Sequence, residues 1–283
     1  MMTPLYGGGA GKFEVVGTST ANSSGTTLTA NATPGSDGAW TQLTAATVND
    51  WHAIHILIHH GATASGQELV DVGIGGAGAE FVVVADIPVG VRAALARCEA
   101  VRVSLPLYVA AGSRVSARIH RASVASLTTR IAIIGENCPI RRIPSFCRAT
   151  TYGTDLANFR GTSVDPGAVA NTKGTRTQVV ASTTNPITAL YILCTRRDSA
   201  AIASDVEALK ETFVGGAGVE VSLIGEFQAW EGNNSGDVSN GRGTAMGPFL
   251  VNLPAASRLS CEARASSATA GEREFQVTYI GLD

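Results

Sequence analysis

The sequence predicts an all-β protein made of two tandem β-sandwich (jelly-roll-like) domains that arose by internal duplication. Three observations predict this fold class. Apolar and polar residues alternate with the period of a strand, similar segments occur twice in the same order, and clusters of Gly, Asn, Ser and Pro separate the candidate strands at intervals of about 8–12 residues. About eight or nine candidate strands fall in each copy, and a jelly roll uses eight.

The internal repeat is the strongest of these observations. Six pairs of segments match, with offsets of 136–146 residues: 16–26 with 160–170, 38–47 with 174–183, 51–59 with 187–195, 73–84 with 213–224, 110–123 with 254–267, and 130–136 with 276–282. A repeating unit of roughly 140 residues has a common domain size. We therefore expect one domain at 1–140, with a Gly-rich N-terminal arm, and a second at 150–283.

Individual segments support strands in both copies, with one exception. Residues 101–109 carry apolar side chains at every second position, and 115–120 alternate apolar with polar side chains. Residues 259–264 repeat this pattern in the second copy. The exception is 204–213, where Ser204 and Glu207 have the spacing of a capping box, which indicates a short helix or helical turn before a strand.

Composition excludes several classes of protein. Charged residues make up 16% and hydrophobic residues 45%, which argues against a disordered chain, and the net charge of −2 argues against a basic nucleic-acid-binding protein. No apolar stretch reaches the length of a membrane span, and we see no secretory signal at the N-terminus. The five cysteines lack a CxxC pair, so we expect buried free thiols rather than disulfides or a zinc knuckle.

The glycine-rich segments predict structure rather than a cofactor site. Residues 73–78, GIGGAG, satisfy GxGxxG, but a strand-like segment follows them where a dinucleotide site needs a helix. The second copy keeps GGAG at 215–218, so we interpret both as tight turns or bulges between strands. Residues 7–13, GGGAGKF, do not have the spacing of a phosphate-binding loop. We expect no cofactor.

Four of the five histidines lie close together: His52, His55, His59 and His60. On an extended chain they divide between two faces, so at most two converge, whereas zinc usually needs three or four ligands. We expect polar residues at an interface. The sequence leaves open whether this cluster binds a metal with help from a symmetry-related chain.

No motif predicts catalysis. GxSxG is absent, and the acidic residues are scattered singly. Glu80 and Glu220 follow the Gly-rich turns, and Arg114 and Arg258 open equivalent strands on their polar faces. We predict a structural ion pair within each copy, Glu80 with Arg114 and Glu220 with Arg258, and no enzyme.

The layout of each copy resembles virion structural proteins of tailed bacteriophages. The resemblance rests on a Gly-Thr-Ser segment, the Gly-Ala-Trp-Thr-Gln strand start at 38–42, the turn at 75–80 and the strand pair at 105–114. Similar phage proteins carry a form of this strand pair close to Pro-x-x-Ile-Pro-Ala-Gly-Ser-Arg. The second copy departs from that form with LPAASR at 253–258 but keeps Pro254 and Arg258. The resemblance implies a non-enzymatic β-sandwich protein on the exterior of a capsid or tail, made in the host cytoplasm. It would serve as a decoration or cement protein, a head fibre or spike, or a tail protein.

The partners implied are other copies of the chain and neighbouring virion proteins, with no nucleic acid or membrane. An alternative is a carbohydrate-binding module for host attachment, with Trp230, Asn233 and Asn234 as glycan contacts, because exposed Trp stacks on sugars. For Trp230 a half-buried loop anchor explains the residue equally well. A third alternative is a polysaccharide hydrolase.

Overall fold

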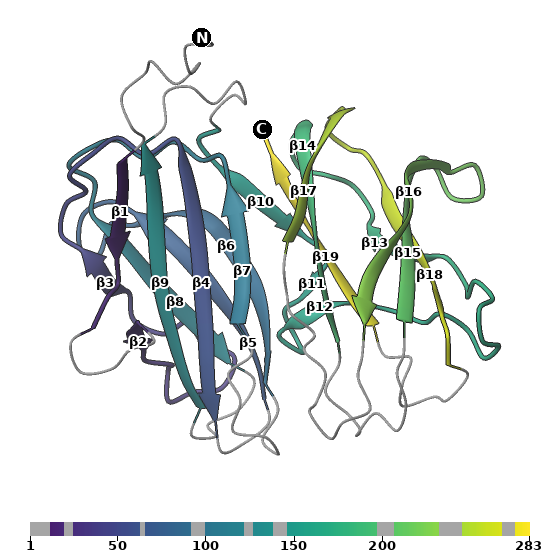
Figure 1. Ribbon diagram of the computed structural model, residues 1–283, viewed down its shortest axis with the longest axis horizontal. Helices are drawn as coiled ribbons and strands as arrows, with labels where there is room; N and C mark the ends of the chain where they lie inside the picture. Colours follow the sequence, from purple (N-terminus) through teal and green to yellow (C-terminus); the bar gives the residue numbers. More distant parts are fainter. Residues whose placement is uncertain are drawn as a thin grey trace, which may run out of the picture.

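The protein is all-β. The computed structural model describes residues 12–19, 25–62, 66–91, 100–121, 127–137, 146–196, 207–231, 245–267 and 275–283. These residues form nineteen strands and no helix. Within them, no helix is long and apolar enough to cross a membrane. Figure 1 shows the strands arranged as two sandwiches side by side, one from each half of the chain.

The first half contributes nine strands. They are β1 (Lys12–Val16), β2 (Thr26–Leu28), β3 (Thr41–Thr44), β4 (Ala53–Ala62), β5 (Gly66–Ile74), β6 (Phe81–Val91), β7 (Ala100–Leu105), β8 (Val115–Arg121) and β9 (Leu127–Asn137). One sheet has the order β1-β9-β4-β7, with β2 also paired to β9, and the other has the order β3-β8-β5-β6. This arrangement of eight strands plus β1 is that of a jelly roll.

The second half contributes ten strands in the same arrangement. They are β10 (Ala149–Tyr152), β11 (Thr154–Asp155), β12 (Arg160–Val164), β13 (Thr177–Val180), β14 (Ile187–Arg196), β15 (Glu207–Val214), β16 (Val221–Glu231), β17 (Ala245–Leu253), β18 (Leu259–Ala265) and β19 (Phe275–Leu282). Strands β12, β19, β14 and β17 repeat the first sheet, with β10 in the place of β1, and β13-β18-β15-β16 repeats the second.

Hydrogen bonds align the two halves residue by residue. The Thr26 hydroxyl donates to the Gly17 carbonyl, and the Thr162 hydroxyl donates to the Gly153 carbonyl. Thr162 therefore corresponds to Thr26. The sequence match of 16–26 with 160–170, which would pair Thr162 with Thr18, is wrong, because small polar residues fit either alignment. The registers of β3, β4, β5, β6, β8 and β9 repeat in β13, β14, β15, β16, β18 and β19 as the other five matches predict.

The two halves share a sheet and a core. Strand β10 pairs with β19 of its own half and, in parallel, with β6 of the first half, so one sheet runs through both (Figure 1). Buried residues of β14 and β19 belong to the same apolar cluster as the core of the first half; they are Ala189, Tyr191, Leu193, Ile280 and Leu282. A separate cluster fills the second sandwich.

The Gly-rich segments around 75–78 and 215–218 are turns between strands, as predicted, whereas residues 1–11 of the expected N-terminal arm lie outside the described residues. Residues 75–80 connect β5 to β6, and Gly75 and Gly78 have φ of 134° and 76°, which suits glycine. Gly215 and Gly218 adopt nearly the same values in the second half, with φ of 128° and 80°.

The expected helix is wrong, and the expectation of buried free thiols is confirmed for Cys194 and Cys261 but not for Cys147. Residues 207–213 belong to strand β15 rather than to a helix, because β15 is hydrogen-bonded to β16 on one side and β18 on the other; Ser204 lies outside the described residues. Among the cysteines that the structure describes, all three are free, and Cys194 and Cys261 are buried, but Cys147 is exposed.

Candidate functional site

Both predicted ion pairs are in contact. Arg114 Nη1 binds Glu80 Oε1, and Arg258 Nη1 binds Glu220 Oε1. In each half the arginine also donates through Nε to a glutamine of the neighbouring strand, at 3.1 Å for Gln42 and 2.9 Å for Gln178. The pairs tie the Gly-rich turn to the start of β8 or β18, which is a structural role.

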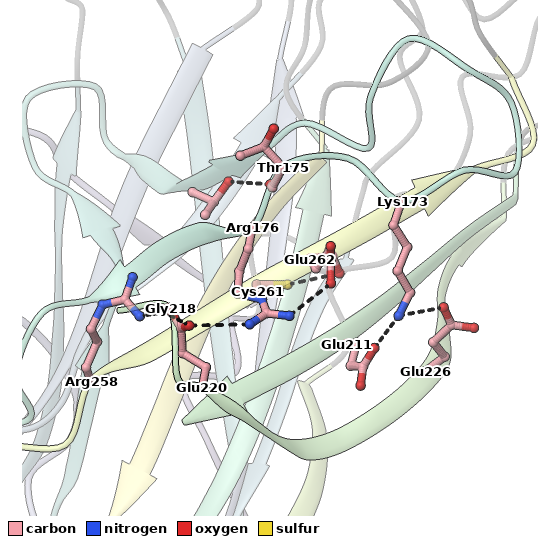
Figure 2. A network of polar contacts seen from close by, with 11 residues as sticks. Lys173, Thr175, Arg176, Glu211, Gly218, Glu220, Glu226, Arg258, Cys261 and Glu262 are labelled. Carbon is pink, nitrogen blue, oxygen red and sulfur yellow. Dashed lines mark hydrogen bonds and ion pairs between the residues drawn. The ribbon is translucent and has the colours of Figure 1, made fainter. Parts of the chain in front are cut away.

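The Glu220 pair belongs to a larger network on the outer face of the second sandwich (Figure 2). Arg176 Nη1 lies 3.4 Å from Glu220 Oε2, and Arg176 Nη2 lies 3.5 Å from Glu262 Oε2. The Arg176 guanidinium also lies over the Phe213 ring, 3.6 Å from its centroid. The hydrogen bond from Arg258 is the largest of several contacts that lower the pKa of Glu220.

A second part of this network lies beside the first. Lys173 Nζ binds Glu211 and lies 3.2 Å from Glu226 Oε1. Arg264 Nη2 lies 2.7 Å from the other oxygen of Glu226. Every ionic group here has an opposite charge as its neighbour, so the face is held together by cross-strand pairs.

The equivalent place in the first half holds a cluster that sequence reasoning missed. Buried Asp71 accepts a hydrogen bond from Arg118 Nε at 2.8 Å and one from His120 Nε2 at 3.1 Å. His120 Nδ1 lies 2.9 Å from Asp37 Oδ1, and Arg118 also binds Asp37. His120 therefore lies between two carboxylates, which favours its protonated form.

Asp86 completes the cluster. Its backbone has φ of 52°, and its N–H donates to Asp71 Oδ1 at 2.7 Å. Burial, followed by the charge of Asp71, raises the pKa of Asp86. Burial also acts to raise the pKa of Asp71, but hydrogen bonds led by the one from His120 outweigh it and lower that pKa. The hydrogen bond to Asp71 raises the pKa of His120.

The two networks occupy equivalent positions with different charges. Asp71 corresponds to Glu211, but Arg118 corresponds to Glu262, and Asp37 to Lys173. The charge at the Asp71 position is kept and the charges at the other two positions are reversed, and in each half the groups present pair with opposite charges. One sequence signal marked Asp71 alone: it interrupts the apolar run of Leu69, Val70 and Val72, whereas its partners on β8 are known only from the register of β5 with β8.

Asp71, Asp86 and His120 place one donor atom each within 4.8 Å of one another, a grouping that a metal ion could use. Their hydrogen bonds argue for a different role. Both His120 nitrogens face carboxylates, and the Arg118 guanidinium already supplies a positive charge to Asp71. The arrangement fits a structural ion-pair cluster, with no nucleophile among the groups that contact it.

His52 and His55 contact different groups. His55 Nδ1 lies 2.9 Å from Ser104 Oγ, and His55 Nε2 lies 3.1 Å from Glu136 Oε2. The His52 ring lies near Tyr108, with centroids 5.7 Å apart. His59 is half-buried on β4, and the side chain of His60 lies outside the described residues. Among described residues, none of these histidines belongs to a group that could hold a metal.

The His55 face is open and carries both apolar and polar side chains. On the outer side of the sheet β1-β9-β4-β7, His55 lies in one row with Ile134 of β9 and Val15 of β1. Val15 is 52% exposed and Phe13 is 64% exposed, while Leu57 and Ile134 are half-buried. The predicted glycan contacts Asn233 and Asn234, and the side chain of Trp230, lie outside the described residues.

Comparison with known proteins gives weak similarities. No protein-family model matches the chain, and no curated protein matches it. A structure of PNGF-II in space group C2 has a TM-score of 0.45 at 10% identity, covering 96% of this chain, which spans 65% of that one. A structure of the infectious bursal disease virus Gx strain has a TM-score of 0.24 at 11% identity, with 96% and 71% covered. Similarity at this level says nothing about the activity of this chain.

Proposed function

We propose that the chain is a non-enzymatic structural component of a bacteriophage virion, on the exterior of the capsid or tail. In this role it acts through contacts with copies of itself and with neighbouring virion proteins. The observation that carries the proposal is the open face around Val15, Leu57 and Ile134. On the same face of the second half, Tyr191, Leu193 and Ile280 are buried inside the chain, so this kind of face already makes one protein contact.

The ionic clusters support this proposal over a catalytic one. Asp71 pairs with Arg118 and His120, and each charged group of the Figure 2 network pairs with an opposite charge. Such pairs stabilise a rigid sheet face. A glycosidase would instead need two carboxylic groups that face a substrate across a cleft.

Mass spectrometry of purified particles and light scattering of the purified chain test the proposal. We expect the chain in the particles and an oligomer in solution. A chain that is monomeric and absent from particles would contradict it.

The second candidate is a carbohydrate-binding module for host attachment. Its candidate glycan contacts are Trp230, Asn233 and Asn234, because an exposed Trp stacks on sugars. A glycan array with the purified chain and with Trp230→Ala tests it. Binding that the variant loses would favour this candidate, and no binding by the intact chain would remove it. Incubation with capsular polysaccharide, with product analysis, tests the hydrolase alternative in the same way.

A further inference from the structure

The contact between the two halves uses two distinct surfaces. The second half presents the edge strand β10 and the outer face of β14, β17 and β19; the first half presents the edge of its sandwich that β6 and β7 form. Ala149 of β10 pairs in parallel with Val84 of β6, and the Thr151 hydroxyl donates to the Ala85 carbonyl. Tyr191 and Leu193 of the outer face are 4% and 0% exposed. The contact is therefore heterologous: a face of one half meets an edge of the other.

The first half has an open copy of the surface that the second half buries. Strand β1 corresponds to β10, because Val15 pairs with Ile134 as Thr151 pairs with Ile280. Leu57 corresponds to Leu193 by the register of β4 and β14. Within the described part of the chain, β1 is paired on one side and its other edge is open.

The second half has an open copy of the surface that the first half buries. Strand β16 corresponds to β6 and is the last strand of its sheet among the described residues. Val83 and Val84 are 3% and 0% exposed on β6, whereas Leu223 and Ile224 at the same positions of β16 are only half-buried. Gly225, which corresponds to Ala85, is exposed.

We propose that copies of the chain associate head to tail through these two open surfaces. Strand β1 of one copy pairs in parallel with β16 of the next, which places Phe13 opposite Ile224, as Ala149 lies opposite Val84 within the chain. The proposal rests on the proposed function and names its self-contact. Open edge strands are templates for pairing with another chain. Repetition of a heterologous contact gives a closed ring or a filament.

The open face is more polar than the buried one, as suits a contact made after folding. His55 and Glu136, which contact each other, occupy the positions of Tyr191 and Leu282. The apolar part of the face is kept, because Leu57 and Ile134 correspond to Leu193 and Ile280. Association should therefore be weaker than the contact within the chain.

A mixing experiment tests the direction of this contact. Val15→Arg blocks the face and Gly225→Arg blocks the edge. Both positions are exposed, and a Cβ at Gly225 would have no neighbour within 4 Å, so both variants should fold. Phe13→Arg is a second face variant. The matched control is Val169→Arg, at a residue 63% exposed in the loop between β12 and β13. Light scattering gives the mass, and circular dichroism checks the fold.

We expect the wild type and the Val169→Arg control to form oligomers larger than dimers, and each blocked variant alone to be monomeric. An equimolar mixture of the two blocked variants should form a dimer, because each supplies the surface that the other lacks. A mixture that stays monomeric, a monomeric wild type, or a blocked variant that still associates alone would overturn the proposal. If the mixture forms dimers but the chain is absent from particles, only the virion role fails.

Discussion

The indole of Trp40 lies directly on Gly73, so that a Cβ atom added to Gly73 would be 2.7 Å from Cη2 of the ring. The Arg118 guanidinium lies over the same Trp40 ring, 4.7 Å from its centroid. In the second half the order is reversed, since Phe213 stands at the position of Gly73 and Arg176 at that of Trp40. One large ring therefore covers this part of each sheet; Trp40, just before β3, supplies it in the first half and Phe213 of β15 supplies it in the second.

This contact predicts how much a methyl group added at Gly73 destabilises the fold. Gly73→Ala should destabilise the fold by about 1–3 kcal/mol, because the added Cβ overlaps Trp40. In a Trp40→Ala background the same change should cost much less, since all three nearest atoms belong to that ring. Urea denaturation of the four proteins measures the coupling. Gly225→Ala is the control, with no neighbour near its Cβ. Equal costs in both backgrounds would show that Trp40 is not the obstacle.

Equivalent leucines should differ in their contribution to stability. Leu193 is 0% exposed between the halves, so Leu193→Ala should cost about 2–5 kcal/mol. Leu57, its counterpart on the open face, is half-buried, and Leu57→Ala should cost about 1 kcal/mol. Urea denaturation at low protein concentration compares them. Similar losses would mean that the face of the first half is already covered within one chain.

Stability should depend on pH through His120. The hydrogen bond to Asp71 raises the pKa of His120 above its ordinary value of 6.5. The protonated ring therefore stabilises the fold at pH values below 6.5, and this contribution is lost as pH rises through the higher pKa of the folded state. Asp37, Asp71, Asp86 and Arg118 are the charged groups around it. Below neutral pH, wild type should melt at a higher temperature than His120→Gln.

The gap between the two melting temperatures should then narrow toward alkaline pH. The pKa of Asp71 is lowered, so this carboxylate stabilises the fold at pH values above 3.8 and loses that contribution only in more acidic solution. Its titration therefore does not affect the change in stability between neutral and alkaline pH. Asp37→Asn removes one of the two carboxylates at the ring and should weaken the pH dependence. A constant gap across neutral pH would rule out His120 as the titrating group.

Cysteine labelling should separate exposed from buried thiols. Burial raises the pKa of the Cys261 thiol to about 12, so that it stays protonated and unreactive at neutral pH. Cys147 is exposed and should react with iodoacetamide in the folded protein. Peptide mapping should find Cys147 modified at once and Cys261 modified only after denaturation. Labelling of Cys261 at the rate of Cys147 would contradict its burial in β18.

Local patterns predicted much of the fold. Alternation of apolar residues depends on neighbours along one chain, so the strands and the turns around Gly75 and Gly215 could be identified. The ion pairs of Glu80 and Glu220 could be predicted because the same Glu and Arg positions occur once in each copy of the repeat. The capping-box spacing of Ser204 and Glu207 misled because it is a local signal, whereas β15 is held by its pairing with β16 and β18.

The Asp71 cluster could not be predicted in the same way. Asp71 and His120 are 49 positions apart, and they meet because β5 and β8 pair in one register. A shift of that register by one residue would turn the side chains of one strand to the opposite face. Acidic residues scattered along a sequence therefore carry no sign of which of them share a site.

The sequence by itself determined that the chain consists of two copies of a β-sandwich pattern, because side-chain alternation and turn residues record strand and face directly. Only the tertiary structure decided which copy of a given surface is buried. Leu193 and Leu57 occupy the same place on equivalent strands, yet one lies between the two halves and the other on an open face. The difference arises because the two halves meet through a face and an edge, and such a contact leaves one face and one edge unused.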